Sequence, residues 1–160
     1  YPVRGMSYPF GDYSEHAICV ARSCGMEYSR TVEDTGRFAI PQDFMKWHPT
    51  THHNGDLEGL WKRFMERDFE EMLLFYVWGH SFEFDRENTW DKMEAFCQMA
   101  ADNENVWYAT NIEIKDYITA VRGLVYSEDG KMIYNPSCQS VWLTVDGEPV
   151  CIPAGALWKK

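Results

Sequence analysis

The stretch M-L-L-F-Y-V-W-G-H, residues 72 to 80, decides the fold that the sequence predicts. Its first seven residues form an unbroken apolar run that is too short for a typical helix and suits a strand covered on both faces. Strands of this kind are typical of the parallel sheets of α/β proteins. Because Gly79 and His80 end the run, we expect His80 at the carboxyl end of a buried strand.

Amphipathic helices and short strands alternate around this stretch. Each expected helix begins with a capping residue and continues with apolar residues at helical spacing. The capping residues are Asp12, Asp56, Asn88 and Thr110. The expected strands cover residues 3–6, 26–32, 72–78 and 106–109. This alternation predicts right-handed βαβ units and a mostly parallel sheet.

Residues 126–160 break the alternation. Two Asp-Gly pairs, at 129–130 and 146–147, lie between apolar runs and indicate type I′ hairpins. We therefore expect residues 1–125 to form an α/β domain, with residues 126–160 as a small antiparallel tail packed on the same domain.

Charge and cysteine content narrow the range of partners. The chain has 160 residues, 25 of them acidic and 15 basic, and a formal net charge of −10. This charge would repel a phosphate backbone or an anionic membrane surface, so no nucleic-acid or membrane partner is expected. Five scattered cysteines favour reduced, mostly buried thiols and a cytoplasmic location, with secretion open if an upstream segment has been removed.

Three segments offer functional chemistry. The turn S-Y-P-F-G, residues 7–11, and His80 both follow expected strands, where α/β proteins bind ligands. An imidazole at such a place can transfer a proton near neutral pH. The loop W-H-P-T-T-H-H, residues 47–53, holds three histidines, so a metal bound by His48, His52 and His53 stays open as an alternative.

Tryptophans near strand ends add a possible sugar-binding surface. Trp47 and Trp78 lie in the histidine loop and at the end of the apolar run. Their flat apolar rings can stack on the faces of sugars. We therefore expect both to line a carbohydrate groove.

The order of these motifs resembles that of polysaccharide deacetylases, the carbohydrate esterases with a distorted (β/α) barrel. The matching segments are S-Y-P-F-G at 7–11, C-G-M-E-Y-S-R-T-V at 24–32, W-H-P-T-T-H-H at 47–53 and V-W-G-H-S-F-E-F at 77–84. The resemblance implies that this chain forms the C-terminal portion of the family's fold. The implied fold class is α/β, a partial or distorted (β/α) barrel with mostly parallel strands.

The resemblance also implies a reaction, the removal of N- or O-acetyl groups from an acetylated carbohydrate by metal-assisted hydrolysis. In this comparison Tyr8, Pro9, Phe10 and Gly11 line the substrate groove, and His80 is the general acid. The family's divalent metal, usually zinc, cobalt or nickel, is held by motifs that precede the Y-P-F-G turn. Those motifs are not upstream of Tyr8, so no metal is assigned to this chain.

The chain is short for a barrel, which needs roughly 250 residues. An open sheet leaves unpaired strand edges, which a second copy of the chain would cover in a homodimer. Two other functions stay open: a non-catalytic carbohydrate-binding or interaction module on the same fold, and an unrelated α/β enzyme with a metal in the histidine loop.

Overall fold

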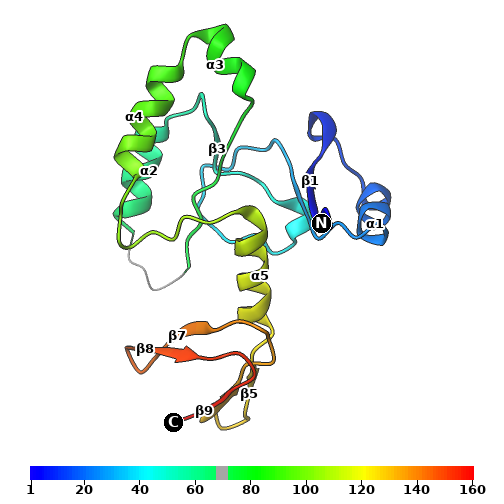
Figure 1. Ribbon diagram of the computed structural model, residues 1–160, viewed down its shortest axis with the longest axis vertical. Helices are drawn as coiled ribbons and strands as arrows, with labels where there is room; N and C mark the ends of the chain where they lie inside the picture. Colours follow the sequence, from blue (N-terminus) through cyan, green and yellow to red (C-terminus); the bar gives the residue numbers. More distant parts are fainter. Residues whose placement is uncertain (68–71) are drawn as a thin grey trace. The chain divides into compact units, whose positions relative to one another are not determined.

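Two parallel strand pairs organise the first half of the chain in the computed structural model, which describes residues 1–67 and 72–160 (Figure 1). β1 (Gly5–Ser7) pairs with β2 (Tyr28–Arg30), and α1 (Glu15–Ser23) connects them. β3 (Thr51–His52) pairs with β4 (Val77–Trp78). Each of these strands is only two or three residues long.

A parallel bridge joins β2 to the segment that precedes β3. Arg30 at the end of β2 lies in register with Trp47, which follows the short helix η2 (Phe44–Lys46). The Thr31 amide donates to the Trp47 carbonyl at 3.0 Å, and the Trp47 amide donates to the Ser29 carbonyl at 3.1 Å. Because the strands of each pair are parallel, the carboxyl ends of β1 and β2 share one edge, and so do those of β3 and β4.

An aromatic core supports the second strand pair. α2 (Leu57–Met65) contacts α4 (Trp90–Ala100), and α3 (Ser81–Glu87) lies between β4 and α4 along the chain. The buried core residues are Phe38, Leu60, Trp61, Phe64 and Ala100. Phe75, just before β4, packs its ring against this cluster, with its centroid 5.4 Å from that of Trp61. The helices therefore hold the segment that leads into His80.

The chain packs as two compact units, Tyr1–Trp107 and Tyr108–Lys160. The second unit begins with α5 (Asn111–Arg122) and continues entirely as antiparallel strands. These strands are β5 (Val125–Tyr126), β6 (Met132–Tyr134), β7 (Val141–Val145), β8 (Glu148–Ile152) and β9 (Leu157–Lys159). Ala120 of α5 is buried with Ile133, Val141 and Ile152, so α5 belongs with the strands that we expected to form the antiparallel tail at residues 126–160.

The prediction of a (β/α) barrel is wrong. The described residues form an α+β structure with separate sheets of two or three strands and no closed barrel. Two strand pairings are parallel and three are antiparallel, so the prediction of mostly parallel strands is also wrong. The strand expected at residues 106–109 does not form.

The apolar run before His80 explains much of this error. Residues 72–76 are irregular, and their amides find partners outside a strand ladder. The Leu74 amide donates to the Phe38 carbonyl at 2.7 Å, and the Tyr76 amide donates to the Thr50 hydroxyl at 3.1 Å. Leu73 and Phe75 pack on the helical core. The run is apolar because it contacts helices, and not because a sheet covers both of its faces.

The caps predicted at Asp56 and Thr110 are confirmed, whereas those at Asp12 and Asn88 are wrong: Ser14 caps α1, and Asn88 ends α3 while Thr89 precedes α4. The Asp56 carboxylate accepts from the Gly59 amide at 2.9 Å at the start of α2, and Thr110 begins α5 with a capping box. At the β7–β8 hairpin, Asp146 and Gly147 both have positive φ, as a type I′ turn requires. At 129–130 only Gly130 does, so the β5–β6 connection is antiparallel without that turn type.

The structure also describes the cysteines and the character of the helices. The cysteines are free, but the expectation that most are buried is wrong: Cys19, Cys24, Cys97 and Cys138 are exposed. Among the helices of residues 1–67 and 72–160, none has the length and apolar character to cross a membrane.

Asn135 provides a test of how the C-terminal unit is held together. Its buried side-chain amide donates to the carbonyls of Gln139, Ile152 and Pro153 at 2.8, 2.9 and 3.1 Å. We predict that Asn135→Ala lowers the free energy of unfolding by about 2–3 kcal/mol, because buried carbonyl oxygens lose their donor. Asn135→Asp should cost more, because a carboxylate oxygen would face those carbonyls. Chemical denaturation measures both changes, and losses below about 0.5 kcal/mol would contradict the prediction.

Candidate functional site

His80 follows β4 after one residue, Gly79, and immediately precedes α3. Its side chain is 51% exposed, so the imidazole can meet a solute. The His80 amide donates to the Glu83 carboxylate at 3.1 Å, which satisfies one of the free amides at the start of α3. The same carboxylate oxygen lies 3.4 Å from His80 Nδ1, so Nε2 is on the side of the ring away from Glu83.

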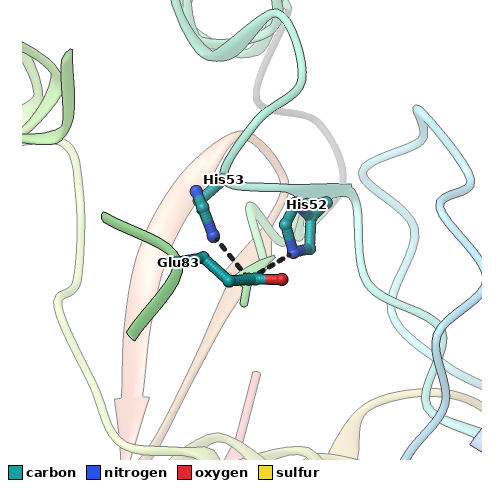
Figure 2. A group of neighbouring side chains, drawn as sticks. All are labelled: His52, His53 and Glu83. Carbon is teal, nitrogen blue, oxygen red and sulfur yellow. Dashed lines mark hydrogen bonds and ion pairs between the residues drawn. The ribbon is translucent and has the colours of Figure 1, made fainter. Parts of the chain in front are cut away.

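Two further histidines meet Glu83 from β3 and the residue after it (Figure 2). Oε2 of Glu83 lies 2.9 Å from Nε2 of His53 and 3.2 Å from Nε2 of His52. One carboxylate oxygen therefore contacts three imidazoles. The other carboxylate oxygen of Glu83, Oε1, lies 3.6 Å from a guanidinium nitrogen of Arg86. We call His52, His53 and Glu83 the His-His-Glu cluster.

These contacts keep Glu83 ionised. The hydrogen bond with His53 is the largest cause that lowers the pKa of Glu83, from an ordinary value of 4.5 to about 2, while partial burial opposes it. The His80 amide and the nearby His52 lower this pKa further. A carboxylate with so low a pKa is a poor general base. Its chemical value lies in orienting imidazoles or in binding a cation.

His53 has a confined position. Its side chain is only 3% exposed and packs against the Phe84 ring, with centroids 4.4 Å apart. On the other side lies the backbone of Gly79, where a Cβ atom would stand 1.8 Å from Cδ2 of His53. A glycine before His80 is therefore required by the His53 ring, which occupies the place of a side chain.

Asp34 connects the ends of β3 and β4. Its carboxylate accepts from the Trp78 indole at 2.6 Å and from the His52 amide at 2.9 Å. Trp78 in turn packs against the His52 ring, with centroids 4.6 Å apart, and carries the guanidinium of Arg30 4.4 Å from its ring centre. Trp78 is thus a structural neighbour of the cluster, with one of its faces covered by Arg30.

The S-Y-P-F-G turn also lies near Arg30, since the Tyr8 amide donates to the Arg30 carbonyl at 3.0 Å. Tyr8 is buried, with its hydroxyl donating to the Met45 carbonyl at 2.9 Å, and Gly11 packs closely against Val32. Phe10 differs from both: it is 98% exposed and has a positive φ of 55°. Bulky residues rarely adopt this conformation, so the backbone holds the Phe10 ring in solvent at some cost.

Pro9 is exposed beside Phe10, whereas two other predicted site residues lie elsewhere. Trp47 has no exposed surface and packs against Phe44 and Tyr76, so it does not line a groove as we expected. His48 contacts the Thr31 hydroxyl through Nδ1 at 2.7 Å and is not a member of the His-His-Glu cluster. The predicted set of His48, His52 and His53 is therefore replaced by one with Glu83 in place of His48.

Glu83 and Asp34 are not among the predicted site residues, although Glu83 follows His80 closely enough in the sequence to orient its ring. Glu83 has a local signal, because it stands three residues after His80 and at the start of a helix these two positions face each other. Asp34 has no comparable signal, since its partners follow it by 18 and 44 positions. Only the folded loop shows that it serves the site.

Comparisons of the chain with protein-family models, with curated proteins and with solved structures found no match. The resemblance to polysaccharide deacetylases therefore stays a prediction from the motifs.

Gly79→Ala tests the confinement of His53. We predict a loss of about 1–3 kcal/mol in the free energy of unfolding, because the new methyl group must displace the His53 ring. The NMR resonances of His53 should shift in the same variant. Gly123→Ala is the comparison and should cost less, since its Cβ would make a tight contact with the Thr119 carbonyl oxygen at 3.2 Å but would overlap no atom. Equal stability of Gly79→Ala and the parent would contradict the packing described above.

Acid pH tests the electrostatics of Glu83. Because the pKa of Glu83 is lowered in the folded state, its ionised form stabilises the fold above about pH 4.5, and this contribution disappears as pH falls towards 2. The stability difference between the parent and Glu83→Gln should therefore shrink as the pH falls below 4.5. Chemical denaturation at a series of pH values measures it, and a difference that does not change with pH would contradict the assignment.

Proposed function

We propose that this chain acts in the hydrolysis of acetyl groups on a carbohydrate, with His80 as the proton donor. The observation that carries the proposal is the pairing of an exposed imidazole with a largely buried, ionised carboxylate: His80 is 51% exposed and Glu83 14%. A base or acid oriented by a second group is the usual arrangement of catalytic histidines. The motif resemblance supplies the substrate class.

Glu83 would position His80 in this reaction. With Nδ1 directed to the carboxylate, the proton on Nδ1 is stabilised and Nε2 faces the substrate. Glu83 itself stays ionised, for the reasons given above, and takes no proton. His80 is then the catalytic residue, and Glu83 is a positioning residue.

The chemical step is an acyl transfer to water. Water adds to the acetyl carbonyl and loses a proton to a base, and the C–N or C–O bond then breaks. His80 Nε2 delivers a proton to the leaving nitrogen or oxygen, so that the products are acetate and a free amine or hydroxyl. A bound divalent metal supplies polarisation of the carbonyl and activation of the water in such reactions. The resemblance assigns the base to motifs outside this sequence.

Phe10 favours a second candidate, a non-catalytic carbohydrate-binding module. Its ring is held in solvent by a strained backbone. An exposed ring can bind a sugar by stacking on it, without any catalytic step. This candidate shares the carbohydrate ligand with the first and differs from it in the reaction.

Acetate release separates the two candidates. N-acetylglucosamine oligomers are incubated with the chain and added zinc or cobalt, and acetate is measured. We expect His80→Ala and His80→Gln to lower kcat at least about 100-fold, because a general acid contributes this much or more. His16→Ala, on the exposed surface of α1, is the control.

Two results decide against the hydrolase. Release by His80→Ala within about tenfold of the parent, roughly 1.4 kcal/mol of barrier, would exclude the acid role. Binding of the oligomers without any acetate release would support the binding module.

A further inference from the structure

We propose that the His-His-Glu cluster is a binding site for one divalent transition-metal cation. The site consists of Nε2 of His52, Nε2 of His53 and a carboxylate oxygen of Glu83, and Zn²⁺ is the cation that this donor set fits best. The inference deepens the proposed function, because it places a metal beside His80, but its test needs no substrate.

The spacing of the donor atoms suits a metal. Among the described residues these three side chains are the group whose donor atoms all lie within 4.8 Å of one another. Tetrahedral ligands with bonds of about 2.1 Å are about 3.4 Å apart. The distances from Glu83 Oε2 to His53 and His52, 2.9 and 3.2 Å, are slightly shorter than this, so the oxygen and each nitrogen need to separate by only a few tenths of an ångström, and the two nitrogens lie within 4.8 Å of each other.

The chemistry of the donors selects the kind of metal. Two imidazoles and one carboxylate are typical of zinc sites that keep a fourth position for water or substrate. Mg²⁺ and Ca²⁺ prefer oxygen ligands, so a site with two nitrogens favours a transition metal. His80 stands next to this group, with Nδ1 3.4 Å from Oε2 of Glu83.

The surrounding residues hold the donors in place before any ion binds. Gly79 and Phe84 confine the His53 ring, and Asp34 fixes the His52 backbone. Glu83 is held by the His80 amide. Preorganised ligands lose little conformational freedom on binding, and such outer contacts are a common property of metal centres.

Metal binding also changes which ring nitrogens of the histidines carry a proton, and this change can be followed by NMR. A histidine binds a metal through an unprotonated nitrogen, so Nε2 of each ring must carry no proton when the site is loaded, and a neutral ring then carries its proton on Nδ1. His52 Nδ1 now accepts from the Asn54 amide at 3.3 Å, and a proton on Nδ1 would end this contact. The Asn54 amide resonance should therefore move when the ion binds.

The test uses the full chain, stripped with a chelator and titrated with Zn²⁺ alone. We expect one ion per chain by elemental analysis and calorimetry, and tetrahedral d–d absorption with Co²⁺ in its place. His52→Ala, His53→Ala and Glu83→Gln should each weaken Zn²⁺ binding at least tenfold. His16→Ala and His48→Ala are the controls and should bind within twofold of the parent, because neither belongs to the cluster.

Folding is checked separately, because His53 is buried. Circular dichroism of each variant without metal shows whether it folds, and His52→Ala with Glu83→Gln carry the conclusion if His53→Ala does not. No Zn²⁺ uptake by the parent, or uptake that survives both of these substitutions, would overturn the inference. So would an Asn54 amide that does not respond to saturating Zn²⁺.

The outcomes also separate this inference from the proposed function. Zn²⁺ bound at the cluster without acetate release by the loaded protein would support the metal site and overturn the hydrolase. Acetate release that depends on His80, from a parent chain that takes up no Zn²⁺ at the cluster, would support the hydrolase and overturn the metal site.

Discussion

Much of the site depends on one carboxylate oxygen. Oε2 of Glu83 contacts His52 and His53 at the end of β3 and accepts from the amide of His80 at the start of α3. These histidines arrive from two separate segments, and the shared oxygen is what holds them within hydrogen-bonding distance. Because several hydrogen-bond donors surround this oxygen, the carboxylate stays charged. Its negative charge in turn attracts the ring N–H groups of the imidazoles that face it.

Short strands alone would give such a site little rigidity. β3 and β4 pair over only two residues each, so few ladder hydrogen bonds fix their relative position. Asp34 adds two hydrogen bonds across their ends, and the buried ring of His53 fills the space above Gly79. Side-chain contacts therefore position the site, as a longer sheet does in larger α/β proteins. The aromatic core that packs against Phe75 supports the segment leading into β4.

The edge that carries His80 combines fixed and exposed parts. Trp78 is fixed by Asp34 and covered by Arg30, while His80 remains open to solvent. This arrangement suits a site in which a rigid polar centre meets a ligand through a few accessible groups. It explains why the proposed proton donor and the proposed metal ligands differ in burial: the ligands are enclosed and the donor is not.

Local signals in the sequence determined the caps of α2 and α5 and the hairpin turn at Asp146-Gly147. They also determined the position of His80 after a strand and the importance of the histidine loop. Each of these features depends on residues a few positions apart. The barrel could not be judged in this way, since an apolar run such as residues 72–76 is equally compatible with a sheet and with contact to helices. Only the tertiary structure decided that His52 and His53 meet Glu83 while His48 does not, that Trp47 is core, and that Asp34 supports the site. Those pairings join residues 17 to 44 positions apart, and their energy depends on distance in space, which spacing along the chain does not specify.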